Sequence, residues 1–283
     1  MTRIALVGAN GMLGSAFAET LVTRGIFFTP LTKKDIDITD RKSLQILKEL
    51  QVDCVINCAA YTAVDLAEKE KEKAFAVNGL GVENLALAAK DYNFFLVHYS
   101  TDYIFSGNKK EGYVETDKPE PLSVYGASKL LGEESILSLL PAKQYLLLRT
   151  AWLYGPNGKN FVQTMLNLAE KQQTIRVVDD QFGCPTYSYD LVKWTLDLLQ
   201  AKKDGIYNAV NSGRCSWFEF AGEIFSLCGK KVEIVNIPSS EYSTPAQRPQ
   251  YSILCNEKLI KALNYSVRNW QEALSDYLIS IKL

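Results

Sequence analysis

The stretch RIALVGANGMLG, residues 3–14, decides the fold class of this 283-residue chain. Residues 4–7 form a short apolar run typical of a strand, and Gly8, Gly11 and Gly14 follow it at G-x2-G-x2-G spacing. The helical pattern SAFAETLVTRG comes next. A glycine turn between a strand and a helix predicts a dinucleotide site, because it brings backbone close to a pyrophosphate at a helix N-terminus. The first spacing is wider than in G-x-G-x-x-G, and a structural turn is the alternative.

The rest of the first 155 residues repeats this alternation of strand and helix. Four further apolar runs, IFFTPLT, VDCVINCA, FFLVHYS and QYLLLRTAWLY, alternate with helical stretches such as DRKSLQILKEL and EKAFAVNGLGVENLALAAKDY. The pattern predicts an α/β fold, a Rossmann-type doubly wound parallel sheet. We expect residues 1–155 to form an NAD(P)-binding Rossmann domain to which later segments return. Residues 156–283 should form mainly a smaller C-terminal substrate-binding lobe, with a soft boundary between the two.

Composition narrows the class of function. The formal net charge of -1 gives no electrostatic reason to expect nucleic acid or an anionic membrane as a partner. No apolar run reaches the ~18 residues of a membrane span, and the chain enters its first strand without a signal-peptide pattern, so we expect a cytoplasmic protein. The one histidine, His98, lies in a strand-like run and is expected to be a packed residue. An enzyme with this composition moves protons by another group.

The end of the second strand bears on the choice of cofactor. NAD-binding proteins place an acidic residue there for the ribose hydroxyls, whereas this chain reads PLTKKD. Lys33 and Lys34 would favour a 2′-phosphate and therefore NADPH, and two solvated loop lysines are the alternative. Asp37 and Ile38 are candidates for contacts with the adenine, although Asp37 or Asp40 could equally cap the helix that follows.

The stretch VYGASKLLGEE, residues 124–134, contains the candidate proton donor. Tyr125 and Lys129 lie four residues apart, on one face of a predicted helix. A phenol has an unperturbed pKa near ~10, and a lysine cation beside it can lower that value. Thr101 ends a predicted parallel strand, where open α/β sheets bind their ligands, and its hydroxyl could help to polarise a carbonyl. Ordinary surface residues and a loop hydroxyl are the alternatives.

These residues resemble the short-chain dehydrogenase/reductases of the extended type, whose hallmark is Y-x3-K with an upstream Ser or Thr. Within them the chain is similar to the dTDP-4-dehydrorhamnose reductases along essentially its whole length. Seven stretches in the family's order carry the resemblance: GANGMLG, NCAAYTAVDLAE, HYSTDYIFSG, PLSVYGASKLLGE, LRTAWLYG, DDQFGCPT and TPAQRP.

The resemblance implies a reaction. NAD(P)H would give a hydride to C4 of dTDP-4-dehydro-β-L-rhamnose and yield dTDP-β-L-rhamnose, the last step of dTDP-rhamnose biosynthesis. Tyr125 would donate the proton, Lys129 would hold the cofactor ribose and tune the tyrosine, and Thr101 would bind the reacting oxygen. NADPH is the expected cofactor, with NADH as a second one, since this family often accepts both.

The family pattern also implies binding residues. Those expected to line the cofactor are Gly11, Met12, Leu13, Asp37, Ile38, Ala59, Ala60, Thr62 and Tyr99. Asp102 and Trp152 would contact the sugar nucleotide, and a core position is the alternative for Trp152. Arg248 is a candidate for the diphosphate of the substrate, since a guanidinium forks onto phosphate oxygens. A solvated or salt-bridged arginine is its alternative.

One departure from the family concerns metal and assembly. Some members pair through a metal bound by glutamates, and the corresponding positions here hold Ala16 and Tyr189. We therefore expect no bound metal, and either a monomer or a homodimer.

Two rival hypotheses stay open. One is a reductase of another 4-keto nucleotide sugar, with the same catalytic group and a different C-terminal pocket. The other is a non-catalytic regulatory subunit, because this fold has such a relative in the β subunit of methionine adenosyltransferase. The presence of Tyr125, Lys129 and Thr101 argues against the second rival, since a binding module needs no phenol and ammonium pair.

Overall fold

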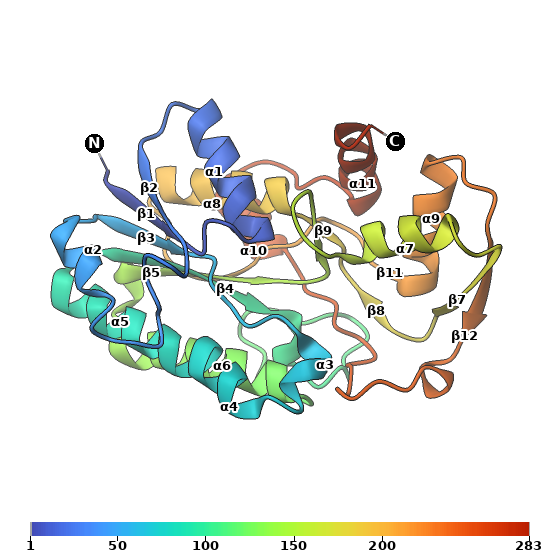
Figure 1. The fold of residues 1–283 in the computed structure, drawn as a ribbon, viewed down its shortest axis with the longest axis horizontal. Helices are drawn as coiled ribbons and strands as arrows, with labels where there is room; N and C mark the ends of the chain where they lie inside the picture. The colour runs from blue at the N-terminus through green and yellow to red at the C-terminus, as the bar shows by residue number, and fades with distance from the viewer. Residues whose placement is uncertain (1, 283) are drawn as a thin grey trace.

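The computed structural model describes residues 2–282 and places a six-stranded parallel sheet at the centre of the larger lobe (Figure 1). The strand order is β10-β5-β4-β3-β1-β2, and every neighbouring pair is parallel. The strands are β1 Ile4–Val7, β2 Phe28–Leu31, β3 Cys54–Asn57, β4 Phe95–Thr101, β5 Tyr145–Thr150 and β10 Gly205–Asn208. This arrangement confirms the predicted doubly wound α/β fold. The chain reverses its direction across the sheet at β1, between β2 and β3, which is where such sheets bind nucleotides.

Helices cover both faces of the sheet, because its strands are apolar on both sides (Figure 1). In β1, Ile4 and Leu6 pack into one core, and Ala5 and Val7 pack into the other. The first core is covered by α1 Met12–Thr23, α8 Ser188–Gln200 and α10 Glu257–Leu263. The second is covered by α2 Gln45–Glu49, α5 Gly81–Tyr92 and α6 Val124–Leu139. Both α8 and the edge strand β10 come from the second half of the chain, and α8 packs against α1.

The smaller lobe packs around a separate aromatic-rich core. Its helices are α7 Phe161–Ala169, α9 Trp217–Leu227 and α11 Trp270–Ser280. Three short two-stranded pairs complete it: β7 Thr174–Val178 with β12 Glu233–Ile237, β8 Phe182–Gly183 with β11 Cys215–Ser216, and β6 Leu153–Tyr154 with β9 Thr186–Tyr187. A capping box fixes the start of α9, because Ser216 and Glu219 each bond the other's backbone N–H.

Two predicted elements differ in the structure. The run at residues 144–154 is divided into β5 and β6 because Trp152 has a left-handed backbone, φ 45°. The helix predicted over residues 40–50 is confined to α2, residues 45–49. Side chains bond the backbone before it: the Ser43 hydroxyl accepts from the Asp37 N–H, and the Asp40 carboxylate accepts from the Lys42 N–H. Such bonds favour turns over helix.

The long helix predicted over residues 72–92 is present but changes its winding. It begins as α4 Lys71–Phe75, continues through a π-helical turn at Ala76–Leu80, and ends as α5. The remaining short elements are α3 Val64–Ala67 and the 3-10 turns Asp102–Ile104, Ala142–Gln144 and Ser239–Glu241. Among the described residues, none of the helices has both the length and the apolar character that a membrane crossing requires.

Candidate active site

The glycine turn closes tightly against the neighbouring strand loop. Gly8 has φ +77°, and a Cβ on it would lie 2.6 Å from the Ala59 backbone nitrogen. A Cβ on Gly14 would lie 2.1 Å from the Gly8 carbonyl oxygen, so this glycine lets α1 pack close to the turn. The N-terminus of α1 is thereby held at the carboxyl edge of the sheet, where its unpaired N–H groups and positive dipole can face an anion.

Two adjoining cavities follow the carboxyl edge of the sheet. One has a volume of about 290 Å³ and the other about 450 Å³, and Gly11, Cys58, Ala59 and Ala60 line both. Of the other residues predicted to bind cofactor, Gly8, Lys33, Asp37 and Ile38 line the smaller cavity, and Met12, Leu13, Thr62, Tyr99, Tyr125 and Lys129 line the larger one. Gly14 lines neither. The two cavities make one cleft with a glycine cradle at its middle.

The residues present fit a nicotinamide dinucleotide. The cradle at Gly8 has no room for a side chain, as a pyrophosphate site against bare backbone requires. Lys33 lines the smaller cavity as the cation that a 2′-phosphate needs. Asp37 accepts from the N–H and hydroxyl of Thr39, at 3.0 Å and 2.7 Å, and these bonds lower the pKa of its carboxyl. Asp37 therefore faces the cleft as an anion and does not cap α2.

Tyr125 lies in the first turn of α6, at the larger cavity. Ser123 caps this helix by accepting from the Gly126 N–H at 3.1 Å. A Cβ on Gly126 would lie 2.2 Å from the Tyr103 carbonyl oxygen, so the glycine brings the helix close to the end of β4. Burial raises the pKa of Tyr125 to about 12, and the Thr101 hydroxyl opposes that rise. The phenol is therefore protonated across the neutral range.

Lys129 lies one helical turn further and is almost fully buried, at 3% exposed. Its Nζ donates to the Tyr99 carbonyl and lies 3.5 Å from Nε2 of His98. Burial lowers the pKa of Lys129 to about 8, against the opposing charge of Glu133. The structure thus differs from the sequence expectation: Nζ of Lys129 bonds the Tyr99 backbone carbonyl near the end of β4, and Tyr125 has a raised pKa where a lowered one was expected. The reason is burial, which outweighs the effect of the lysine.

Thr101 and Asp102 lie beside Tyr125 at the end of β4. The Thr101 hydroxyl donates to Oδ1 of Asp102 at 3.0 Å and accepts from the Tyr103 N–H at 3.2 Å. Burial raises the pKa of Asp102 to about 6, and the hydroxyls of Ser252 and Thr101 oppose that rise. Its Oδ2 is buried without a hydrogen-bond partner among the described residues. An unpaired buried carboxylate oxygen at a cavity wall is suited to bind a hydroxyl of a ligand.

The remaining predicted residues are Trp152 and Tyr99, which line the larger cavity, and Arg248, which does not. Trp152 lines the larger cavity, and its ring stacks on Trp217 with centroids 3.3 Å apart and planes 5° apart. Tyr99 also lines that cavity, but its phenol bonds Thr195 of α8 at 2.9 Å, on the face of the sheet opposite to α6. The backbone of Tyr99 is therefore the part that borders the cavity. Arg248 lines neither cavity.

Arg248 instead forms the salt bridge that the sequence left open as its alternative. Its guanidinium bonds both carboxylate oxygens of Asp65, at 2.9 Å and 3.1 Å. The prediction that it binds the diphosphate has no support in this arrangement, because a guanidinium forked onto a carboxylate has fewer donors free for phosphate.

Sequence reasoning missed several residues of the larger cavity. Trp217 comes from the start of α9, Lys159 from the loop before α7, and Tyr103 from the turn after β4. Tyr103 lies in the stretch HYSTDYIFSG, whereas Trp217 lies outside every stretch that carried the resemblance, and no local spacing marks either residue as facing a ligand. Asn57 ends β3 opposite His98 of β4, and its polar side chain at the end of an apolar strand was the one available signal.

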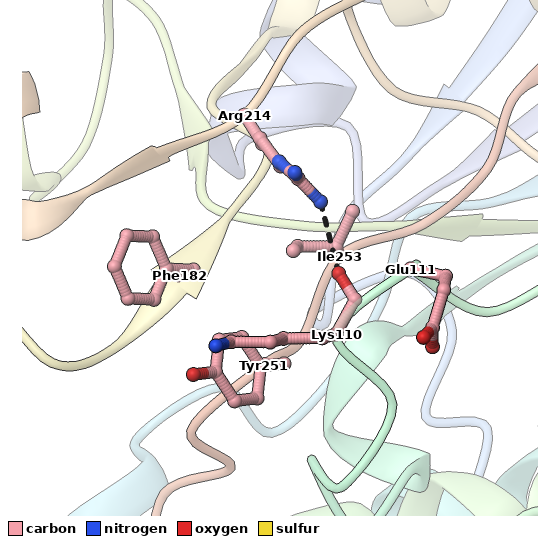
Figure 2. Close-up of a pocket in the computed structure, with 6 residues that line it drawn as sticks. All are labelled: Lys110, Glu111, Phe182, Arg214, Tyr251 and Ile253. Carbon is pink, nitrogen blue, oxygen red and sulfur yellow. Dashed lines mark hydrogen bonds between the residues drawn. The ribbon is translucent and has the colours of Figure 1, made fainter.

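A further cavity of about 370 Å³ lies between the smaller lobe and the loop that follows β4 (Figure 2). Arg214 donates to the Lys110 carbonyl there at 2.9 Å, and the rings of Phe182 and Tyr251 stack with centroids 5.5 Å apart. Gly183 faces Trp152, so Phe182 on the same strand points to the opposite face of the β8–β11 pair. This cavity therefore lies on the face of the β8–β11 pair opposite to Trp152, and it shares no lining residue with the cleft.

A tyrosine and a lysine that line a dinucleotide cleft can transfer a proton to a carbonyl that receives a hydride. The fold and this pair define the class of the protein, which is a Rossmann-fold oxidoreductase of the short-chain dehydrogenase/reductase type. The model of one family, described as the RmlD substrate binding domain, matches residues 1–282. The chain belongs to that family.

Individual relatives match over nearly the whole chain. The spore coat polysaccharide biosynthesis protein SpsK of Bacillus subtilis is 42% identical over 98% of this chain and 97% of its own length. A dTDP-4-dehydrorhamnose reductase of Burkholderia thailandensis is 37% identical over 96% of each chain. The crystal structure of the dTDP-4-dehydrorhamnose reductase of Bacillus anthracis, in complex with NADP, superimposes with a TM-score of 0.94 at 39% identity, over 99% of this chain and 100% of that one.

Proposed function

We propose that this protein reduces the C4 keto group of dTDP-4-dehydro-β-L-rhamnose with NADPH, and gives dTDP-β-L-rhamnose. The observation that carries the proposal is the group formed by Tyr125, Thr101 and Asp102 next to the glycine cradle, in one cleft. The names of the full-length relatives support the substrate, and the NADP in the related crystal structure supports the cofactor. NADH is a second cofactor in this proposal.

Tyr125 is the proton donor of the proposed reaction. A bound nicotinamide would supply the hydride to C4, and negative charge would then develop on the C4 oxygen. With a pKa near 12, the Tyr125 phenol keeps its proton at neutral pH and can release it only to a strong base, such as a developing alkoxide. We assign Lys129 to the cofactor ribose, because it lines the same cavity, although in this structure it bonds the Tyr99 carbonyl.

Thr101 has one hydroxyl proton, and in this structure it is directed to Asp102. For Thr101 to donate to the C4 oxygen, Asp102 must accept from another group, and a sugar hydroxyl would serve. Its unpaired Oδ2 supports this assignment. We assign the stacked pair Trp152 and Trp217 to the apolar face of the sugar, because aromatic faces at a cavity wall suit such a surface.

The test is NADPH oxidation with dTDP-4-dehydro-β-L-rhamnose generated in situ. We expect turnover by the wild type and a loss of about 10²–10⁴-fold in kcat for Tyr125→Phe, the usual range for a general acid. Tyr103→Phe is the matched control, since its ring lies 5.7 Å from that of Tyr125 in the same cavity. It should lose far less activity.

The opposite result has a defined meaning. A folded wild type that binds cofactor and yet turns over with neither NADPH nor NADH would refute this substrate. Other 4-keto nucleotide sugars would then be tried, and failure of all of them would revive the regulatory-subunit hypothesis.

Three further parts of the proposal concern the whole protein. We propose that residues 156–283 supply mainly the substrate-binding lobe, as the positions of Trp217 and Lys159 at the cavity support. The protein would act in the cytoplasm, and its six free cysteine thiols are the form typical of a reducing compartment. It would act as a monomer or a homodimer.

A further inference from the structure

His98, the one histidine of the chain, lies directly behind the candidate catalytic lysine. It is 1% exposed in the middle of β4, on the face covered by α6. Its Nδ1 lies 3.0 Å from Nδ2 of Asn57, the residue opposite it on β3, and its Nε2 lies 3.5 Å from Nζ of Lys129. Burial keeps this imidazole neutral by lowering its pKa well below the usual value. A neutral ring has one N–H, and its position decides what Lys129 faces.

The backbone fixes the orientation of the Asn57 amide. Oδ1 of Asn57 accepts from the Ala59 N–H at 3.1 Å, and a backbone N–H can only donate. The oxygen of the amide must therefore point to Ala59, and the nitrogen must point to His98. Flipping the amide would set an N–H against an N–H in a site that is 1% exposed.

The tautomer of His98 follows from that orientation. Because the Asn57 nitrogen donates, Nδ1 of His98 must accept, and the ring proton must be on Nε2. The alternative tautomer would lose the 3.0 Å bond to Asn57 and gain only the 3.5 Å contact with Lys129. A 3.5 Å contact is too long to offset the loss of a 3.0 Å hydrogen bond in a buried site.

We propose that His98 is a positioning residue, locked by Asn57 as its Nε2–H tautomer, which turns an N–H toward Nζ of Lys129 and favours the free amine of that lysine over its ammonium. An amine can accept from Nε2–H and still donate to the Tyr99 carbonyl, whereas an ammonium has no lone pair with which to accept. The role in catalysis rests on the proposed reductase function, but the tautomer does not.

Other groups near Lys129 act on the same equilibrium. From α6, the Glu133 carboxylate favours the ammonium, although Arg149 of β5 shares that charge through a bidentate pair. Cys58, from the loop after β3, is a half-buried thiol that desolvation keeps neutral by raising its pKa. Tyr125, from α6, is a neutral phenol across the neutral range, and only its ionisation at high pH would add a charge. His98, on β4, therefore supplies a neutral N–H that disfavours the ammonium form of Lys129.

The single histidine makes the test direct. In protein labelled with ¹⁵N-histidine, two-bond ¹H–¹⁵N correlation spectra give the protonation of both ring nitrogens without assignment. We expect a protonated Nε2 and an unprotonated Nδ1 at pH 7. A protonated Nδ1, or a ring protonated on both nitrogens at that pH, would overturn the proposal.

A pH titration tests the link to Lys129. We expect the ring signals to shift in one step with a midpoint near pH 8, the pKa to which burial lowers that of Lys129. The step should disappear in Lys129→Met, which keeps the ring and removes the amine. A step that survives in that variant, or no step in the wild type, would show that Nε2 does not face a titrating amine.

A swap of the tautomer separates this role from packing. Asn57→Asp keeps an acceptor for Ala59 and offers a second oxygen to Nδ1, so we expect the ring proton to move to Nδ1. Asn78→Asp is the matched control, because Asn78 is equally buried but bonds Tyr61 and Ser128 and does not touch His98. It should leave the proton on Nε2. A swap in both variants, or in neither, would refute the role of Asn57. These readouts need no substrate, so a failed reductase assay and a failed tautomer test remain separate results.

Discussion

At the scale of single residues, we expect the two adjacent lysines after β2 to differ, with Lys33 binding the cofactor and Lys34 solvated. Both side chains are exposed, but only Lys33 lines the smaller cavity. We expect Lys33→Ala to lower kcat/KM for NADPH about 10-fold or more and to leave that for NADH nearly unchanged, because a charge-assisted bond is worth ~1.5–3 kcal/mol. Steady-state kinetics with both cofactors measures this.

Lys34→Ala is the control for that change of charge. An equal loss in both variants, or an equal loss with NADH, would mean that the 2′-phosphate is recognised elsewhere.

Asp102 is a residue at which stability and function should oppose each other. Its folded pKa, about 6, lies above the ordinary value of 3.8, so its ionisation is disfavoured in the folded protein. This carboxyl therefore costs stability above pH 6, and the cost fades as the pH falls toward 4. We expect Asp102→Asn to raise the free energy of unfolding by up to about 3 kcal/mol at pH 8 and to lower activity. Urea unfolding at pH 8 and pH 4.5 would measure the first effect.

The gain from Asp102→Asn must shrink as the pH falls. A gain of equal size at both pH values would assign the effect to packing instead of to the buried charge.

At the scale of elements, α6 is held to β5 by a buried ion pair. Arg149 and Glu133 are 3% and 1% exposed and bond through three contacts of 2.7–3.2 Å. Glu133→Gln should lower the free energy of unfolding by about 3–5 kcal/mol, because it leaves the guanidinium buried without its counter-charge. It should also lower the pKa of Lys129 further and move the alkaline limb of kcat/KM to lower pH, since Glu133 supports the ammonium.

The double variant Glu133→Gln with Arg149→Met is the companion measurement. It should recover part of the stability, because no uncompensated charge remains, but not the pH profile. Recovery of both would contradict a role for Glu133 in tuning Lys129.

Elements were also where sequence patterns predicted best. The glycine turn, the strands and the i, i+4 spacing of Tyr125 and Lys129 are local, and the structure contains each of them. Two predicted elements, the helix at residues 40–50 and the strand at residues 144–154, differ in the structure because of local backbone effects. Hydrogen bonds that the Ser43 and Asp40 side chains accept from backbone N–H groups shortened α2, and the left-handed backbone at Trp152 divided a predicted strand. Neither effect has a signature in hydrophobic periodicity.

At the scale of the whole molecule, the two predicted halves of the chain depend on each other. β10 is an edge strand of the main sheet, and α8 covers α1 with Leu191, Val192 and Leu198, which are fully buried. We expect a fragment of residues 1–155 to lack cooperative thermal unfolding, because it would lose α8 and α10 and keep only α1 on one face of its sheet. Circular dichroism and NADPH binding, each compared with the full chain, would measure this. A fragment that unfolds cooperatively and binds NADPH as the full chain does would make residues 1–155 an independent domain.

The sequence by itself determined the class of fold, the cofactor turn and the identity of the candidate proton donor, because each is written in residues a few positions apart. Only the tertiary structure decided what these residues face. Arg248 meets Asp65 across 183 positions of the chain, Trp152 meets Trp217, and His98 lies between Asn57 and Lys129. Such pairs follow from the register of strands and the packing of helices over them, which depend on the whole folded chain and leave no local pattern.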